Sequence, residues 1–316
     1  MRYIIAVDSG GTKTEGVLTD NDGHIFSREL AKGGNPLDAG VESTREAVLS
    51  VVKGLIPKAP GPVEALYAGI AGANHVETGL EELLGRECSI PQIRIEDDRR
   101  EVVSGTLGHT SGCGMICGTG SSLSVIIEDQ PIRQIGGLGY LIDTGGSGYE
   151  LGQAALKHAF RYKDGRGPRT LLLELLEREL GGDIWDNMAM IYSGGRSFIA
   201  SLAHTVFDGA AMGDAVCRDI MKKAAYSLSE LTLAAEQWFE GDFPVVMTGG
   251  ILTAYPEYTK LIRNGASPRA RMIMAAAPPV YGAVVEALWM LGLTAGDETR
   301  KNFLNDYQSI KMSGKE

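Results

Sequence analysis

The order of segments at the N-terminus constrains this chain most, because it occurs again in the middle of the sequence. An apolar segment at residues 3–7 leads into a turn of glycine and hydroxyl residues at 9–12, and strand character resumes at 16–20. Residues 115–117, 118–122 and 123–127 repeat this order of strand, turn and strand. The repeat predicts two related lobes, each beginning with two strands joined by a glycine turn.

The length and the glycine content agree with that prediction. A chain of 316 residues suits two lobes, since domains usually hold about 100 to 200 residues. Its 42 glycines are nearly twice the usual share. They gather beside β-branched segments, where the backbone must turn tightly or approach a ligand.

Charge and hydropathy exclude two classes of partner. A net charge of -10 disfavours DNA or RNA, because lysine and arginine supply most of the affinity for phosphate backbones. The longest uncharged stretch, residues 102–127, is rich in Gly, Ser and Thr, whereas a spanning helix needs about 20 mainly apolar residues. We therefore expect no nucleic acid and no membrane partner.

The N-terminus and the cysteines indicate the compartment. The apolar start of the chain is too short for a signal peptide. Four cysteines in a chain of this length do not form a disulfide framework, and we expect reduced thiols. The sequence thus predicts a cytoplasmic protein.

The periodicity of apolar residues places the lobe boundaries. We predict an N-terminal lobe over residues 1–110, a C-terminal lobe over 111–293 and a C-terminal helix and tail over 294–316. Residues 147–241 are almost wholly helical by periodicity and are predicted to be a helical insertion in the second lobe.

The first turn carries the sharpest chemical signal. Adjacent glycines free the backbone N–H groups to converge on an anion, hydroxyl groups add donors, and the preceding Asp8 can hold Mg²⁺ through water. The chain contains neither a G-x-x-x-x-G-K-[ST] loop nor a G-x-G-x-x-G fingerprint. The alternative is an ordinary tight hairpin, in which Lys13 only solvates a strand edge.

Two further glycine turns follow strands, at 118–121 and at 248–250. A bound nucleotide needs contacts both to its phosphates and to its ribose or base. Three glycine turns at strand ends can divide that task between the lobes, and in this order, with Asp8 before the first, they resemble the actin-like ATPase and sugar-kinase superfamily.

A more specific resemblance extends over about residues 4–290. It rests on these motifs: Ala6-Val7-Asp8-Ser9-Gly10-Gly11-Thr12-Lys13-Thr14-Glu15, Gly34-Asn35-Pro36, Gly69-Ile70-Ala71-Gly72, Gly118-Thr119-Gly120-Ser121, Gly136-Gly137-Leu138-Gly139, Gly146-Ser147-Gly148, Thr248-Gly249-Gly250 and Pro279-Val280-Tyr281-Gly282-Ala283. Together they resemble the BadF/BadG/BcrA/BcrD ATPase family, and within it the N-acetylglucosamine kinases. The resemblance implies an α/β fold of two ribonuclease-H-like (actin-like ATPase) lobes with an ATP-Mg²⁺ cleft between them.

The resemblance also implies roles for the residues of the three turns. Asp8 is implied as the metal ligand. The residues implied in binding ATP are Asp8, Gly10, Gly11, Thr12, Lys13, Gly118, Thr119, Gly120, Ser121, Gly249 and Gly250.

On the sugar side the match is less complete. The implied substrate-binding residues are Asn35, Gly72, Asp97, Gly136, Gly137, Asp143 and Thr144. Leu138 stands where the family often has an aromatic residue, and Thr144 stands where it has a sugar-binding aspartate, with Asp143 one position earlier.

Phosphorylating a hydroxyl group requires a base near the attacking oxygen. The carboxylates at 96–98 follow a predicted strand, and by resemblance Asp97 is that base. The alternative is that Asp97 or Asp98 only caps the helix that begins at Arg99, since aspartate is a favoured N-cap residue.

We therefore predict an enzyme, an ATP-dependent kinase of a small amino sugar that phosphorylates the 6-hydroxyl of N-acetylglucosamine, with ATP and Mg²⁺ as cofactors. We also expect a homodimer. Two alternatives stay open: an ATPase that activates a 2-hydroxyacyl-CoA dehydratase or an aromatic-CoA reductase, with Cys113 and Cys117 as cluster ligands, and a non-catalytic sugar or nucleotide sensor, which the departure at Thr144 favours.

Overall fold

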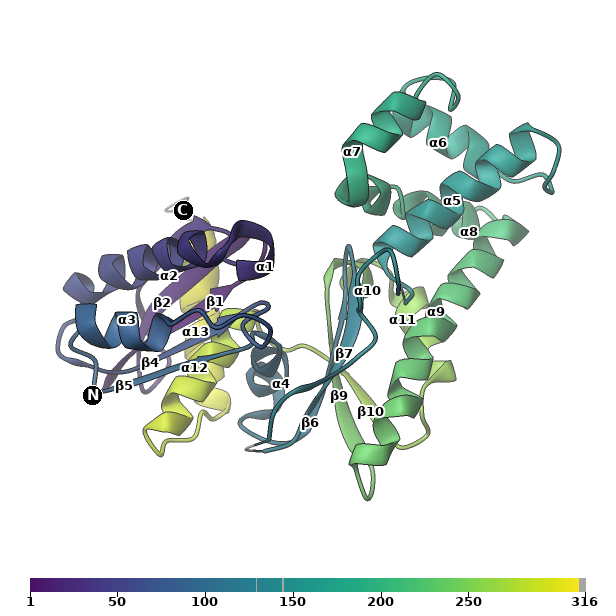
Figure 1. The fold of residues 1–316 in the computed structure, drawn as a ribbon. Coiled ribbons are helices and arrows are strands. Elements are labelled where there is room, and N and C mark those ends of the chain that lie inside the picture. Colours follow the sequence, from purple (N-terminus) through teal and green to yellow (C-terminus); the bar gives the residue numbers. More distant parts are fainter. Residues whose placement is uncertain (129, 144, 313–316) are drawn as a thin grey trace. The chain divides into compact units, whose positions relative to one another are not determined.

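The computed structural model describes residues 1–128, 130–143 and 145–312, which form two compact units. The first unit contains Met1–Gly112, Ile126–Ile132 and Ala275–Glu316, and the second contains Cys113–Val125 and Arg133–Met274. Figure 1 shows the elements of both units coloured along the chain.

The first unit is built on a five-stranded sheet. Its strands are β1 (Tyr3–Ser9), β2 (Lys13–Asp20), β3 (Ile25–Lys32), β4 (Val63–Ile70) and β5 (Gln92–Glu96), in the order β3-β2-β1-β4-β5. The first three strands form an antiparallel meander, whereas β4 is parallel to β1 and β5 is parallel to β4. The turn between β1 and β2 therefore lies at the end of the central strand.

Alternation along β1 directs side chains to both faces of this sheet, and helices cover each face (Figure 1). One face packs Ile5 and Val7 under α2 (Val41–Leu55) and α3 (Leu80–Glu87). The other packs Ile4 and Ala6 under α12 (Pro279–Met290) and α13 (Asp297–Met312). The short helix α1 (Pro36–Ala39) follows β3, and α4 (Arg99–Leu107) follows β5 and packs on α12.

The second unit repeats the same strand order. Its strands are β6 (Gly112–Cys117), β7 (Ser121–Ile126), β8 (Arg133–Ile135), β9 (Phe243–Thr248) and β10 (Ala270–Met274), in the order β10-β9-β6-β7-β8. Read from β8, each strand takes the place of its counterpart in the first unit. The repeated topology confirms the predicted fold class of two ribonuclease-H-like lobes.

A layer of helices enters between β8 and β9, as the periodicity predicted. It consists of α5 (Gly148–Lys163), α6 (Leu172–Leu180), α7 (Met188–Ser201), α8 (His204–Ala211) and α9 (Ala215–Ala235). After β9 come α10 (Gly250–Ala254) and α11 (Pro256–Gly265), and α11 packs against α9. Across the described residues, no helix is both long and apolar enough to cross a membrane.

The compact units differ from the predicted boundaries at residues 126–132 and from Ala275 onward, both of which belong to the first unit. We expected the second lobe to continue to residue 293, but α12 belongs to the first unit. Its residues from Val280 to Leu288 are all buried, and Val280, Val284 and Ala287 join the core under β1 and β4. Hydrophobic periodicity identifies the helix but not its partner, because an apolar helix suits either sheet equally.

Candidate functional site

The turn between β1 and β2 presents backbone donors that no described residue accepts. The N–H of Gly10 donates to the carbonyl of Lys13 at 2.9 Å, which closes the turn. The N–H groups of Gly11 and Thr12 make no hydrogen bond to any other residue in the described part of the chain. Below the turn, the hydroxyls of Ser9 and Thr14 lie 2.8 Å apart. The turn can therefore donate two N–H groups to an anion.

The fold itself does not require glycine in this turn. A Cβ at Gly10 would lie 3.8 Å from the carbonyl oxygen of Lys13, and one at Gly11 would lie 3.5 Å from Asp38 Oδ2, both ordinary contacts. At Gly33, by contrast, a Cβ would collide with the carbonyl of Gly11. The absent side chains at Gly10 and Gly11 thus leave a space that a Cβ would fill.

Three carboxyl groups gather beside this turn. Asp8 pairs in register with Gly69 of β4, and because Gly69 has no side chain, Asp98 and Glu101 of the next connection pack directly on β4. Burial, with a contribution from Glu15, raises the pKa of Asp8 to about 6. Burial followed by the charges of Asp97 and Asp8 raises the pKa of Asp98 to about 8. The site therefore favours a cation or a bound proton.

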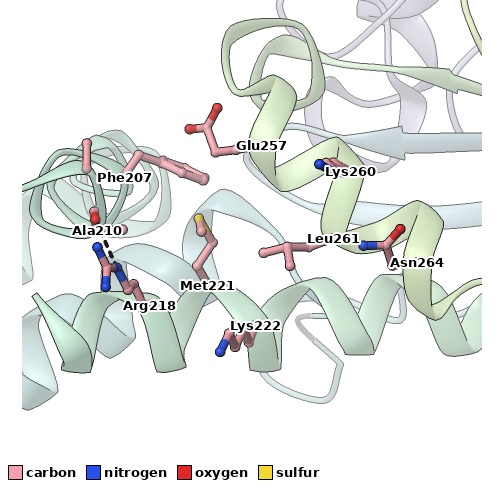
Figure 2. Close-up of a pocket in the computed structure, with 10 residues that line it drawn as sticks. Phe207, Ala210, Arg218, Met221, Lys222, Glu257, Lys260, Leu261 and Asn264 are labelled. Atoms are coloured by element: carbon pink, nitrogen blue, oxygen red, sulfur yellow. Dashed lines mark hydrogen bonds between the residues drawn. The ribbon is translucent and has the colours of Figure 1, made fainter. Parts of the chain in front are cut away.

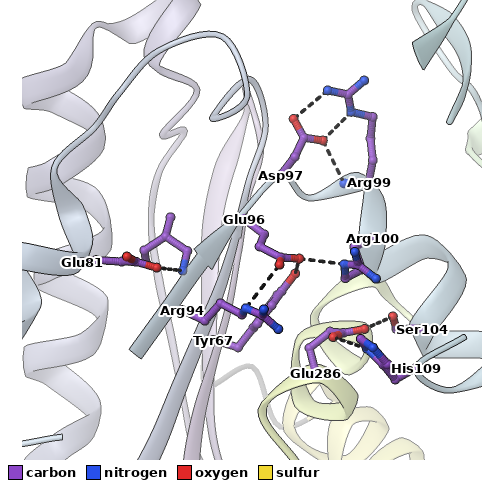
Figure 3. A network of polar contacts seen from close by, with 11 residues as sticks. Tyr67, Glu81, Arg94, Glu96, Asp97, Arg99, Arg100, Ser104, His109 and Glu286 are labelled. Atoms are coloured by element: carbon purple, nitrogen blue, oxygen red, sulfur yellow. Dashed lines mark hydrogen bonds and ion pairs between the residues drawn. The ribbon is translucent and has the colours of Figure 1, made fainter. Parts of the chain in front are cut away.

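The neighbouring Asp97 is already paired. Its buried carboxylate accepts a 2.8 Å hydrogen bond from Arg99 Nη2, a shorter one from Arg99 Nε, and a 3.2 Å bond from the Arg99 backbone N–H (Figure 3). Asp98 occupies the N-cap position of α4 without a side-chain cap bond. The alternative to a catalytic role was that one of the two aspartates contacts the start of α4. Asp97 makes that contact, through the backbone N–H of Arg99.

A buried polar network holds α4 in place (Figure 3). Glu96 at the end of β5 accepts from Arg100 Nε at 2.7 Å and from the Tyr67 hydroxyl at 3.1 Å. On α12, the buried Glu286 lies 2.8 Å from His109 Nδ1. These contacts fix the start and the end of α4, and hence the position of Asp98.

Asn35 and Gly72, both predicted on the sugar side, lie together in the first unit. A Cβ on Gly72 would lie 2.9 Å from Asn35 Oδ1, and Gly72 has φ +82°. Asn35 caps α1, accepting from the N–H of Leu37 at 2.9 Å, and donates to Asp38 at 3.1 Å. Its side chain therefore has a structural role whatever it binds.

The turn between β6 and β7 repeats the free donors of the first turn. Gly118 N–H donates to the carbonyl of Gly120 at 2.8 Å, whereas the N–H groups of Thr119 and Gly120 find no partner among the described residues. The start of α5 anchors the turn, since the N–H groups of Gly148 and Tyr149 donate to the carbonyls of Gly118 and Thr119 at 2.8 and 3.1 Å.

Arg196 reaches this second turn, and the sequence analysis did not single it out. A Cβ on Gly120 would lie 2.5 Å from Arg196 Nη2. The available signal was the pair Gly194-Gly195 directly before Arg196, which breaks a helical pattern. A glycine pair alone does not show which way the following side chain points.

The loop after β8 is closed by Asp143. Its carboxylate accepts from the N–H of Gly137 at 2.8 Å, and both Gly136 and Gly137 have φ near +70°. Ser121, at the end of the turn between β6 and β7, donates to the carbonyl of Gly145 at 2.7 Å. The structure thus brings Gly136, Gly137, Asp143 and Ser121 together, and Thr144 lies outside the described residues.

The third turn, after β9, contains Gly249 and Gly250, and only Gly249 lacks room for a side chain. Gly249 has φ +119°, and a Cβ there would collide with the carbonyl of Cys117 on β6. At Gly250, a Cβ would meet no atom within 4 Å. Gly249 is therefore needed for strand packing, and Gly250 leaves open space at the start of α10.

A pocket of about 420 Å³ opens elsewhere in the second unit, between α8, α9 and α11 (Figure 2). Phe207, Met221 and Leu261 form much of its apolar wall, with Arg218 and Lys260 at its edge. None of the residues predicted from sequence lines it. It is a feature of the helical layer that the motifs did not indicate.

The cysteines do not support the iron–sulfur alternative. All four are free and buried, and burial raises the pKa of both Cys113 and Cys117 to about 12. Cluster ligation needs thiolates, which such an environment disfavours. Within the described ranges, no group of three His, Cys, Asp or Glu side chains has the arrangement of a metal site.

Comparison with known proteins agrees with the predicted resemblance. A model of the BadF/BadG/BcrA/BcrD ATPase family matches residues 5–287. The N-acetylmuramic acid/N-acetylglucosamine kinase of Clostridium acetobutylicum is 28% identical, covering 91% of this chain and 98% of that protein. The N-acetyl-D-glucosamine kinase of Dictyostelium discoideum is 27% identical, covering 90% and 97%.

Solved structures show the same fold. A protein from Chromobacterium violaceum superposes with a TM-score of 0.70 at 24% identity, covering 90% of this chain and 98% of that one. A glucokinase of the ROK family from Streptomyces griseus, solved with glucose and AMPPNP, superposes with a TM-score of 0.55 at 18% identity, covering 90% and 98%.

Proposed function

The chain belongs to the BadF/BadG/BcrA/BcrD ATPase family, and on that premise we propose that it is an ATP-dependent amino-sugar kinase. Its reaction is transfer of the γ-phosphoryl group to the 6-hydroxyl of N-acetylglucosamine. The observation that carries the proposal is the pair of glycine turns, each with two N–H groups that no described residue accepts. The names of the relatives from Clostridium and Dictyostelium support the amino sugar.

The two turns bind the phosphates of ATP in this proposal. Gly10, Gly11 and Thr12, with Lys13 beside them, serve one part of the triphosphate. Gly118, Thr119, Gly120 and Ser121 serve another, and Gly249 and Gly250 approach the adenosine. Backbone N–H groups fixed before the substrate arrives need no reorganisation as charge moves between phosphoryl oxygens.

Asp8 fits the role of Mg²⁺ ligand. Its carboxyl group lies beside the phosphate turn, and the carboxyl groups near it give the local field that a cation relieves. Mg²⁺ usually takes one or two protein carboxylates together with phosphate oxygens and water, so a single aspartate suffices. When bound, the ion would neutralise charge on the phosphates.

The contacts shift the assignment of the base from Asp97 to Asp98. Asp97 is held by Arg99 in a two-point ion pair, so its carboxylate already has a charged partner. Asp98 has a pKa raised to about 8 and makes no side-chain cap bond. A general base works best with a pKa near the operating pH. We assign Asp98 to the hydroxyl proton and Asp97 to holding Arg99 and the start of α4.

The sugar side of the proposal uses Asn35 and Gly72 in the first unit and Gly136 and Gly137 in the second. Asp143 acts by closing the loop that carries both glycines, through its bond to the N–H of Gly137. The predicted role of Thr144 stays a proposal. Because the Clostridium relative takes N-acetylmuramic acid as well, we include a 3-O-substituted amino sugar among the substrates.

Two broader parts of the proposal concern assembly and location. We propose a homodimer, which is the state expected from the sequence. We also propose that the enzyme works in the cytoplasm, which the four free, buried thiols support.

The deciding experiment is ADP release from Mg-ATP with the purified protein, screened over N-acetylglucosamine, N-acetylmuramic acid, glucosamine, glucose and a uronic acid. We expect the N-acetylated sugars to give the highest kcat/KM, with a 6-phosphate product identified by NMR. The Asp98→Asn variant is the control for contaminating kinases. Ligand-dependent rises in Tm without ADP formation would instead identify a sensor.

A further inference from the structure

We propose that Arg196 binds the transferred phosphoryl group of ATP and neutralises its charge during transfer. The inference rests on the proposed function and adds a residue that none of the glycine motifs contains. Its starting point is the position of the guanidinium group, whose Nη2 lies 2.5 Å from where a Cβ on Gly120 would be. The space that glycine leaves open at the second turn is therefore bordered by a cation.

The backbone of α7 is built to deliver this side chain. Gly195 has φ +62° and ψ -157°, which interrupts the helix directly before Arg196. A left-handed φ of this kind is accessible mainly to glycine. At Gly194 the ring of Phe198 packs so closely that a Cβ would collide with it. The break redirects the chain so that the second half of α7 begins at Arg196.

Arg196 also lacks an acidic partner in the part of the chain that the structure describes. Considering only residues that the structure describes, no carboxylate forms an ion pair with it. Its guanidinium carbon lies 5.8 Å from the ring centre of Tyr140, in the loop that follows β8. Stacking on an aromatic ring fixes the plane of a guanidinium group without cancelling its charge.

Lys13, the cation beside the first turn, is less free to bind a phosphoryl group. Lys13 lies 2.5 Å from the buried carboxylate of Glu15, so its charge is already compensated. The first N–H groups of α5 are taken by the carbonyls of Gly118 and Thr119. Of these groups, Arg196 alone retains an uncompensated positive charge, and its planar fork matches two oxygens of a phosphoryl group.

The test compares Arg196→Gln with Lys157→Gln, a matched control in which another cation bordering the same pocket as Arg196 and Tyr140 is neutralised. We expect Arg196→Gln to lower kcat for sugar phosphorylation about 100-fold, as for loss of one transition-state donor, with a change in sugar KM below about threefold. Arg196→Lys should recover a part of kcat, because it restores the charge but not the fork. Lys157→Gln should behave as wild type.

Calorimetry provides a readout that does not depend on turnover. We expect Arg196→Gln to weaken AMPPNP binding about tenfold while adenosine binding stays unchanged, since adenosine lacks the phosphates. The proposal would be overturned if variant and wild type bound AMPPNP with equal affinity, or if the variant bound AMPPNP and adenosine more weakly by the same factor. If wild type phosphorylates no sugar but shows this nucleotide selectivity, the sugar-kinase proposal fails and the Arg196 assignment stands.

A second variant tests the geometry directly. Gly120→Ala must displace the Arg196 guanidinium, and the fold tolerates it because the only close atom is at the end of a flexible side chain. If both changes act on one contact, the double variant should lose little more activity than Arg196→Gln alone. Fully additive losses in kcat would mean that Arg196 acts away from the turn and would contradict the proposal.

Discussion

The turns β1–β2 and β6–β7 occupy the same place in two sheets of the same topology, yet their electrostatic surroundings are opposite. Carboxyl groups surround the first turn: Asp8 contributes to the raised pKa of Asp98, and Asp8 and Asp98 both contribute to the raised pKa of Glu101. The second turn has no carboxylate at the position of Asp8, where Ile116 stands, and meets Arg196 instead.

Under the proposed function, this difference gives different tasks to two turns that occupy the same place in the repeated topology. Strand order and the glycine turn fix where backbone donors lie, and both units keep them. The charge beside each turn comes from another connection: α4 follows β5 in the first unit, and α7 belongs to the helical layer of the second. One turn is thereby suited to a cation and a proton, and the other to anionic oxygens.

We expect the largest loss of activity from a change in the carboxyl groups beside the first turn. Asp98→Asn should lower kcat about 10²- to 10⁴-fold, the usual contribution of a general base, with the fold and ATP affinity kept. Asp97→Asn should instead lower the free energy of unfolding by about 3 kcal/mol, because it leaves Arg99 without its buried partner. Kinetics and thermal unfolding of both variants decide the matter. An inactive Asp97→Asn beside an active Asp98→Asn would restore the assignment made from sequence.

Asp8→Asn should have the next largest effect. Loss of a metal-binding carboxylate should lower kcat/KM for Mg-ATP about 100-fold and raise the Mg²⁺ concentration needed for half-maximal rate. Because Asp8 carries a raised pKa, the neutral amide should not destabilise the fold. Unchanged magnesium dependence would remove the metal role.

Gly10→Ala and Gly33→Ala compare a glycine that borders open space at the first turn with one that is closely packed against it. Gly10→Ala should keep the Tm within about 2 °C of wild type while raising the KM for ATP about tenfold, because its methyl group enters the phosphate space. Gly33→Ala should lower the Tm markedly, since its Cβ would collide with the carbonyl of Gly11. A lower Tm for Gly10→Ala with normal KM would show that the glycine serves the turn.

Asn35→Ala tests the sugar side of the first unit. We expect the KM for N-acetylglucosamine to rise about fivefold to tenfold, with a loss of about 1 kcal/mol of stability because the cap of α1 is removed. The KM for ATP should be unaffected. Asn35→Asp keeps the cap, so normal sugar affinity in that variant combined with loss in Asn35→Ala would assign Asn35 to structure only.

The smallest expected effect concerns pH. A carboxyl group whose pKa is raised to about 8 in the folded protein destabilises the fold as pH rises from about 4 through 8, because folding then holds a proton that the unfolded chain releases. Asn cannot ionise, so the stability of Asp98→Asn relative to wild type should rise between pH 5 and pH 9. Urea unfolding at both pH values without metal measures this. A pH-independent difference would refute the raised pKa.

Much of the architecture was predictable from local pattern. The alternation of apolar residues and the glycine turns indicated the first two strands of each unit, and the 3.6-residue period indicated the helical layer over 147–241. The first two turns hold N–H groups that no described residue accepts, and their binding of phosphate stays a prediction. These features depend on residues adjacent in sequence, whose preferences for turn, strand or helix act before any distant contact forms.

Other features depended on which segments pack together. The resemblance assigned the base to Asp97, whereas our proposal of Asp98 rests on the ion pair between Asp97 and Arg99, which exists only in the folded chain. It did not indicate Arg196, which reaches Gly120 from 76 positions further along the chain. It placed α12 in the wrong unit, since an apolar helix has no local preference between two sheets. Composition and periodicity determined the elements and the turns, whereas burial and charge contacts, which arise only when the chain folds, decided what each side chain can do.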